Sequence, residues 1–315
     1  MEGKVSEWAI ESSGLSRSFG SVRACEELSL RVRAGSVFGF LGPNGAGKTT
    51  TIHLLLGLLE PSAGNATVLG HDIRTAADQV RLRTGALLQN AGLYDRLTAE
   101  DNLEFYGRIW RLPTAERRTR IRELLEHVGL WERRNDLVST WSGGMRQKLG
   151  VVRALLHRPA LVFLDEPTAG LDPMAAAALR EDLAALSEQE GITVFLTTHN
   201  LSEAERLCHQ VAVIRQGRLV AIGSPDELRR QRSAPRLEIV GSGFGDSVLE
   251  GLRARPEVVA VKLAGDRLVI DVRAGAESAP LVGQVVAAGA SVEEVTRPRA
   301  SLEDVFLTLM EESNG

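Results

Sequence analysis

The chain has 315 residues, of which 43% are hydrophobic and 25% charged, as is typical of a globular protein with a large domain and a smaller one. The formal net charge of −4 argues against nucleic acid as a partner. Two cysteines, Cys25 and Cys208, are too few for a disulfide framework. The N-terminus has no apolar run suited to a signal peptide, and the run at 54–59 is far shorter than the roughly 20 residues that cross a bilayer. We therefore expect no transmembrane segment in this chain.

The first part of the chain contains strand patterns followed by helix patterns. Strands and turns are expected over residues 1 to about 35, where apolar and polar residues alternate. The short apolar run at 36–42 predicts a buried strand, and it leads into a helix pattern at 48–59. Arginine-rich amphipathic helices are predicted between about 97 and 158.

Strand patterns return further along the chain. They lie at 160–165 and 192–198, and an alanine-rich helix is predicted between them at 173–189. Strand, helix and strand at this spacing predict an α/β fold with a parallel core sheet, into which the arginine-rich helices are inserted.

The character of the sequence changes again near its last third. Residues 229–235 are basic, include a proline and lack apolar periodicity, so they are predicted to form a linker. Residues 236–315 follow the order strand, helix, strand, strand, helix, strand, with a closing helix, which is typical of the ferredoxin-like α+β pattern. The sequence thus predicts a large domain at 1–228, with a helical subdomain at about 95–158, and a C-terminal accessory domain.

A glycine-rich segment follows the first buried strand. The sequence GPNGAGKTT at 42–50 matches the pattern G-x-x-x-x-G-K-[ST] between a strand and a helix. Small residues let backbone N–H groups converge on phosphate oxygens, Lys48 adds a positive charge, and Thr49 offers a hydroxyl to Mg²⁺. A plain glycine-rich turn is the alternative. The predicted nucleotide-binding residues of this segment are Gly42, Pro43, Asn44, Gly45, Ala46, Gly47, Lys48, Thr49 and Thr50.

Two acidic residues end the buried strand at 160–165. Asp165 lies where a carboxylate could reach the magnesium ion directly or through water, and Glu166 follows it. We expect Glu166 to project toward the attacking water as a general base. A solvated acidic pair that opens a turn before Pro167 is the alternative.

Two further polar residues end strand patterns. His199 closes the strand at 192–198, and if this strand is parallel to the one before the P-loop, its carboxyl end faces the γ-phosphate. His199 could then bind the phosphate or hold Glu166 and the water in line. Gln89 ends the GALLQ segment in the same way and could contact Mg²⁺ or the water. A structural role for His199 is the alternative.

The chain resembles the ATPase subunits of ATP-binding cassette (ABC) transporters, because five motifs occur in the order and approximate spacing of that family. They are the P-loop, Gln89, WSGGMRQ at 141–147, LVFLDEPTAGLD at 161–172 and TTH at 197–199. The resemblance covers residues 5 to about 228. It implies a P-loop NTPase cassette with an N-terminal antiparallel β subdomain that binds ATP and Mg²⁺.

The resemblance also implies a role for each motif residue. Lys48, Gln89, Glu166 and His199 would act in catalysis, and Thr49, Gln89 and Asp165 would hold Mg²⁺. Asp172 would be the D-loop residue, and Phe19 would lie against adenine, where many members of the family have tyrosine.

The segment WSGGMRQ would act on a neighbouring copy of the chain. Ser142, Gly143, Gly144 and Met145 would close over the γ-phosphate bound by the other subunit of a homodimer. The usual form of this motif in the family is LSGGQ, so Trp141 and Met145 depart from it.

Within the family, the chain is similar to the multidrug and antibiotic-resistance exporters of the daunorubicin-resistance type, through TAGLDP, SGGM and the ending SLEDVFLTLM. This implies an ATP-driven export motor that acts on a drug-like or amphipathic compound. The motor would lie on the cytoplasmic side of the cell membrane, held by a separate polytopic permease. The segment 89–103 after Gln89 is our candidate for the surface that contacts the permease, with a plain loop as the alternative.

Three other functions fit part of the sequence. An importer ATPase shares the cassette, but many importers carry a β-rich C-terminal domain, whereas strands and helices alternate after residue 236. A nucleic-acid-associated cassette would need long insertions or a second cassette, and the acidic balance disfavours it. A small-molecule P-loop kinase would explain Lys48 and Asp165 but would leave WSGGM and His199 without a role.

Overall fold

The computed structural model describes residues 7–232, 236–273, 275–297 and 301–312. Contacts divide the chain into two compact units, with the division between residues 225 and 226. Within the described ranges, every helix is too short or too polar to cross a membrane.

An antiparallel sheet forms the start of the first unit. Its strand order is β2-β1-β5-β6, with β3 paired to β1, and all these pairings are antiparallel. The strands are β1 (Trp8–Phe19), β2 (Val22–Leu28), β3 (Arg31–Arg33), β5 (Ala63–Val68) and β6 (His71–Asp72). The expected N-terminal antiparallel β subdomain is confirmed.

A second sheet forms the centre of the same unit. Its order is β11-β10-β4-β9-β8-β7, and every pair from β10 to β7 is parallel, while β11 pairs with β10 in an antiparallel hairpin. The strands are β4 (Val37–Leu41), β7 (Thr84–Leu87), β8 (Leu161–Asp165), β9 (Thr193–Thr198), β10 (Gln210–Arg215) and β11 (Arg218–Gly223). Strands β4, β8 and β9 are buried on both faces, which explains their largely apolar sequences. The predicted parallel core sheet is confirmed.

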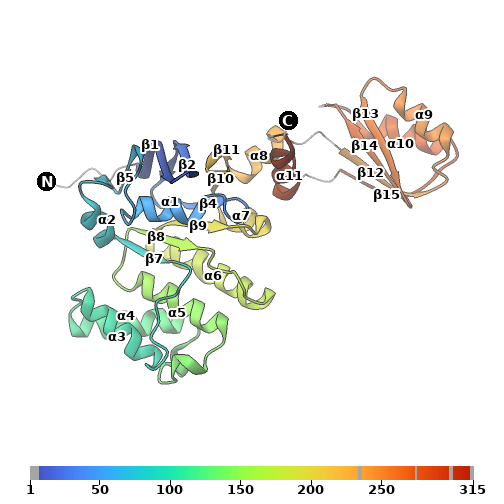
Figure 1. Ribbon diagram of the computed structural model, residues 1–315. Coiled ribbons are helices and arrows are strands. Elements are labelled where there is room, and N and C mark those ends of the chain that lie inside the picture. The colour runs from blue at the N-terminus through green and yellow to red at the C-terminus, as the bar shows by residue number, and fades with distance from the viewer. Residues whose placement is uncertain (1–6, 233–235, 274, 298–300, 313–315) are drawn as a thin grey trace. The chain divides into compact units, whose positions relative to one another are not determined.

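Helix α1 (Lys48–Leu55) packs between the two sheets, because it contacts β2 and β5 on one side and β8 on the other (Figure 1). One hydrophobic core therefore joins both sheets, and in it the rings of Phe38 and Phe163 contact that of Phe195. The helix is shorter than the pattern at 48–59 predicted. It ends at Leu55, and Gly57, with φ of +63°, turns the chain away.

The remaining helices of this unit include the predicted helical insertion, whose helices lie between residues 99 and 155. The remaining helices are α2 (Ala77–Arg83), α3 (Ala99–Ile109), α4 (Thr114–His127), α5 (Gly143–Leu155), α6 (Pro173–Glu190) and α7 (Leu201–Leu207), with short 3₁₀ helices at Trp131–Arg133 and Val138–Thr140. Several begin at side-chain caps. Thr98 accepts a hydrogen bond from the Asp101 N–H, and Asp172 accepts from the N–H groups of Met174 and Ala175.

The second unit contains a four-stranded antiparallel sheet of order β13-β14-β12-β15. In chain order its elements are β12 (Arg236–Ser242), α9 (Asp246–Arg253), β13 (Val258–Ala264), β14 (Arg267–Val272), α10 (Ser278–Ala287), β15 (Ser291–Thr296) and α11 (Leu302–Glu312). This strand order is that of the ferredoxin-like pattern, so the topology predicted for this part of the chain is confirmed.

Helix α8 (Pro225–Arg232) precedes this sheet. Residues 229–232, which the sequence predicted to be part of a linker, lie within α8, while 233–235 lie outside the described residues. The prediction was wrong for residues 229–232 because a short, largely polar helix has no apolar periodicity. Helix α8 buries Leu228 but is otherwise largely polar.

Candidate nucleotide-binding site

A cavity of about 610 Å³ opens where β4, β7 and β8 end. Ligands of open α/β sheets bind at this edge, because the carboxyl ends of the parallel strands and the following loops meet there. The residues that line the cavity are Val22, Arg23, Ala24, Asn44, Gly45, Gly47, Lys48, Thr49, Thr50, Gln89, Gln147, Asp165, Glu166 and Ala169.

The P-loop backbone depends on glycine at Gly47. This residue precedes the first turn of α1 with φ of +105°, and a Cβ added there would lie 2.1 Å from the carbonyl oxygen of Ala24. Side chains other than hydrogen are therefore excluded by both conformation and contact. The close approach places β2 directly against the phosphate loop.

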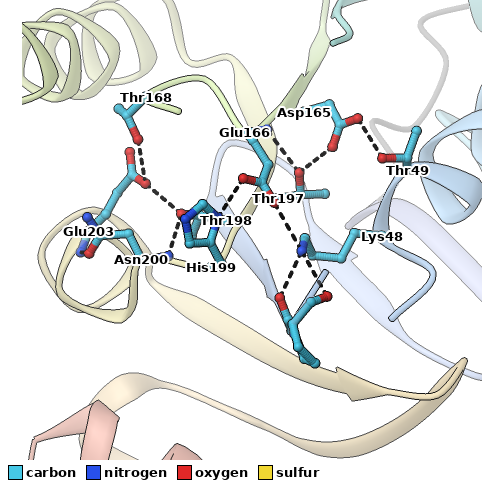
Figure 2. A network of polar contacts seen from close by, with 12 residues as sticks. Lys48, Thr49, Asp165, Glu166, Thr168, Thr197, Thr198, His199, Asn200 and Glu203 are labelled. Atoms are coloured by element: carbon cyan, nitrogen blue, oxygen red, sulfur yellow. Dashed lines mark hydrogen bonds and ion pairs between the residues drawn. The ribbon is translucent and has the colours of Figure 1, made fainter. Parts of the chain in front are cut away.

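Lys48 lies at the start of α1 and is almost fully buried, with a side chain only 6% exposed. Its ammonium nitrogen donates to the carbonyl oxygens of Gly42 and Pro43, at 2.8 and 3.2 Å. The same nitrogen is 3.0 Å from Oε1 of Glu166 (Figure 2). One positive charge thus joins the P-loop to the acidic end of β8.

Asp165 is buried and bonded on both carboxylate oxygens. The hydroxyl of Thr49 donates to Oδ2 at 2.7 Å, and the hydroxyl of Thr197 donates to Oδ1 at 2.6 Å. A hydroxyl and a carboxylate so close together form the hard oxygen set that Mg²⁺ prefers. The residues present therefore fit the predicted metal.

Glu166 has an unusual backbone for a residue with a side chain, with φ of +51°. Its N–H donates to the carbonyl oxygen and to the hydroxyl of Thr197, which hold this conformation in place. The left-handed turn directs the side chain back over the P-loop, and strained positions of this kind gather at functional sites.

His199 follows β9 and contacts Glu166. The distance from Nδ1 of His199 to Oε2 of Glu166 is 2.6 Å, and the His199 side chain is 57% exposed (Figure 2). Strand β9 lies parallel to β4 and β8, which explains why residues so distant in sequence meet here. The structure therefore brings together Lys48, Glu166 and His199.

Of the two remaining predicted residues of the nucleotide site, Gln89 lines the cavity and Phe19 does not. Gln89 lines it, two residues beyond the end of β7 rather than at the strand end itself. Phe19 is not among the described lining residues. It contacts the Arg17 guanidinium, while its partner across the β1–β2 pair, Val22, lines the cavity.

Gln147 is a lining residue that the sequence analysis missed. It lies in the first turns of α5, within the segment WSGGMRQ, which was assigned to a neighbouring copy of the chain. Its distance from Gly143, one helical turn, gave no signal for this cavity, because Gly143 does not line it.

The segment at the start of α5 lies apart from this cavity, because the described lining residues include none of Ser142, Gly143, Gly144 and Met145. Ser142 caps α5 by accepting from the Met145 N–H at 3.3 Å. A Cβ added at Gly143 would meet open space, and one at Gly144 would approach the Ala175 side chain to 3.2 Å. The segment therefore offers an accessible helix N-terminus. Trp141, which replaces the usual leucine, is buried.

Two groups near the site have shifted pKa values. Burial raises the pKa of the Cys25 thiol, whose sulfur lies 3.3 Å from the Thr51 hydroxyl, so this cysteine stays a neutral packing residue under the P-loop. Burial also raises the pKa of Glu203 in α7, although hydrogen bonds from Thr198 and Thr168 oppose that shift.

Two family descriptions match the chain. One, described as "ABC transporter", matches residues 25–169, and the other, described as "ATP-binding protein DrrA1-3-like, C-terminal domain", matches residues 223–310. The two matches fall on the nucleotide-binding unit and on the second unit, respectively.

Individual proteins are similar over nearly the whole length. The daunorubicin resistance ATP-binding protein DrrA3 of Streptomyces coeruleorubidus is 38% identical, over 97% of this chain and 96% of that protein. The Nod factor export ATP-binding protein I of Rhizobium johnstonii is 39% identical, over 98% of this chain and 96% of that protein. A solved ATP-binding subunit of an ABC transporter superimposes with a TM-score of 0.64 at 33% identity, covering 71% of this chain and 92% of the other.

The cassette fold, the cavity at its strand ends and these similarities agree. The chain belongs to the ATP-binding subunits of ABC transporters, in the branch of the daunorubicin-resistance proteins, and it is an ATPase.

Proposed function

We propose that this chain is the ATP-hydrolysing motor of an exporter that moves a drug-like or other amphipathic compound through a separate membrane subunit. The observation that carries the proposal is the presence, on one chain, of an ABC cassette and a DrrA-type C-terminal domain. The similar proteins named above are a resistance protein and an export protein. They do not favour the importer and nucleic-acid alternatives.

The contacts around Glu166 support a role for each residue of the site. ATP would place its phosphates on the P-loop, where Lys48 and the N-terminus of α1 favour negative charge. Glu166 would accept a proton from the attacking water, and His199 would hold its carboxylate in position. Mg²⁺, held by Thr49, Asp165 and Gln89, would supply positive charge that stabilises the phosphate oxygens.

The open N-terminus of α5 supports a homodimer. Ser142, Gly143, Gly144 and Met145 would face the γ-phosphate of the partner copy, and Asp172, which caps α6, would lie near the dimer axis. Met174 beside it is 84% exposed, as expected of a residue that a partner covers. Two chains would then form two complete sites.

A hollow lined by β7 and by residues of α5 supports contact with a membrane subunit. It has a volume of about 220 Å³, and Leu58, Trp110 and His157 are among the residues that line it. The Trp110 and His157 rings stack at 3.7 Å, and burial lowers the pKa of His157 to about 4, so that its imidazole is neutral at physiological pH. Arg81 and Arg153 also line the hollow, so it combines apolar surface with positive charge, as a site for an amphipathic partner helix would.

Tyr94 belongs to the segment 89–103, and its ring lies near that of Tyr106, which in turn contacts Arg153 of the hollow's lining. Its side chain is 47% exposed and contacts the Phe105 ring, whereas its backbone N–H and carbonyl bond to the side-chain amide of Asn102, at 2.8 and 3.0 Å. The backbone is thus fixed independently of the ring. An exposed aromatic ring on a fixed backbone suits an interface anchor.

Tyr94→Ala is expected to weaken the complex with the membrane subunit by roughly tenfold or more, because truncated aromatic anchors cost about 2 kcal/mol. Affinity for ATP should stay within about twofold, since the cavity does not include Tyr94. Retention of the membrane subunit in detergent and binding of a fluorescent ATP analogue measure the two effects. Val286→Ala, which truncates an exposed apolar side chain of the second unit, is the control. Unchanged retention for Tyr94→Ala would count against this docking surface.

The proposed function as a whole is tested by purifying the tagged full-length chain from detergent-solubilised membranes of its own host. We expect a polytopic membrane protein to co-isolate, because the chain would lie on the inner face of the cell membrane through that subunit alone. Recovery with ribosomes or DNA instead, without a membrane protein, would contradict the proposal.

A further inference from the structure

Glu203 is a buried carboxyl group directly behind the site. It lies in α7, four residues after His199, and is 0% exposed. Its Oε2 accepts two hydrogen bonds, from the hydroxyl of Thr198 at 2.7 Å and from the hydroxyl of Thr168 at 3.0 Å (Figure 2). No sequence motif identified this residue.

The two threonines belong to the two segments that carry the reacting side chains. Thr168 lies two residues after Glu166, in the turn that leaves β8, and Thr198 immediately precedes His199 at the end of β9. These two turns are far apart in the sequence, since α6 and the rest of β9 separate Thr168 from Thr198. The buried Glu203 carboxyl therefore joins the two turns on the side away from the cavity, while the Glu166–His199 contact joins them on the side of the cavity.

The start of α7, the helix that carries Glu203, is itself held in place. The Asn200 N–H donates to the Thr198 hydroxyl oxygen at 2.9 Å, and the Asn200 side chain caps α7 by accepting from the Glu203 N–H at 3.2 Å. Because of these bonds, the position of Glu203 is coupled to the end of β9.

A buried acid is costly at this place. Burial raises the pKa of Glu203, as does the nearby charge of Glu166, and among the described residues Oε1 has no hydrogen-bond partner. A leucine of similar size would fill the space without that cost. Packing alone thus does not account for a carboxyl group, whereas a bridge between two hydroxyl donors does.

We infer that Glu203 is a positioning residue for ATP hydrolysis, which acts through Thr168 and Thr198 to fix Glu166 and His199 relative to each other. This inference rests on the proposed roles of Glu166 and His199. Glu203 is not among the described residues that line the nucleotide cavity. Its loss should therefore change turnover rather than ATP affinity.

Steady-state ATP hydrolysis and equilibrium ATP binding test the inference. Glu203→Leu is expected to lower kcat by about 10- to 100-fold, because small misplacements of catalytic groups cost up to about 10²-fold. Its Kd for ATP should stay within about threefold, which also shows that the variant is folded. Glu203→Gln keeps an acceptor oxygen for both hydroxyls and should retain most of kcat. Arg206→Ala, on the exposed side of the same helix, is the control.

The double variant Thr168→Val/Thr198→Val removes the two donors with little change of shape. It should lower kcat by an amount comparable with that of Glu203→Leu, and combining all three changes should add little further loss. Two outcomes would overturn the inference: normal kcat for Glu203→Leu, or a Kd for ATP that rises as much as kcat falls. Failure of the proposed role of Glu166 is distinguishable, since in that case Glu166→Gln would hydrolyse ATP normally.

Discussion

Glu166→Gln is expected to bind ATP normally and to hydrolyse it more slowly by about 10²- to 10⁴-fold, the range that a lost general base accounts for. Glutamine keeps the size of the side chain and can still approach Lys48 and His199, which lie 3.0 and 2.6 Å from the carboxylate. It cannot take a proton from water. The ATP-bound protein should accumulate as a dimer, because the event that reopens the dimer would be missing.

Phosphate release and size-exclusion chromatography with and without ATP measure these two effects. Glu188→Gln is the matched control, since it makes the same chemical change at an exposed position of α6. If Glu166→Gln turned over at the rate of the unaltered protein, Glu166 would not be the base.

Gly47→Ala is expected to abolish ATP binding, with a loss of more than about 100-fold in affinity. The added methyl would lie 2.1 Å from the Ala24 carbonyl oxygen, and that oxygen belongs to a β-strand backbone that cannot rotate away. The residue must also keep φ of +105°, a backbone angle that residues with a Cβ atom rarely adopt. The P-loop or β2 must therefore shift.

Gly45→Ala separates these two causes. Gly45 also has a positive φ, of +79°, but a Cβ added there would meet open space. Only the conformational cost of about 1–2 kcal/mol should remain, which predicts a far smaller loss of affinity. Isothermal titration with ATP, alongside thermal unfolding of both variants, measures the difference. Equal affinities for the two alanine variants would show that the contact with Ala24 does not matter.

Much of the fold followed from patterns that burial imposes on the sequence. The apolar runs at 36–42, 160–165 and 192–198 predicted buried parallel strands, and β4, β8 and β9 are such strands. In the second unit, alternating patterns and helix patterns predicted the ferredoxin-like order that the sheet has. The polar helix α8 escaped prediction because it lacks such a pattern.

In the candidate site, residues of a contiguous sequence motif were predictable, whereas residues brought there by the tertiary fold were not. The P-loop was predictable because its chemistry lies in nine consecutive residues, 42–50. Glu203 and Gln147 were not, because their relation to the site depends on where helices α7 and α5 come to lie in the fold. The assignment of Phe19 to adenine stays a prediction, and the cavity lining shows Val22 beside that position.

Thr197 has a consequence for how this site can change during evolution. Its single hydroxyl donates to Asp165 and accepts from the Glu166 N–H, so one atom supports both acidic residues. Serine could replace it, whereas alanine or valine would disturb both carboxylates at once. Substitutions at 165, 166 and 197 are therefore expected to be epistatic, and new chemistry at this strand end would require several of them to change together.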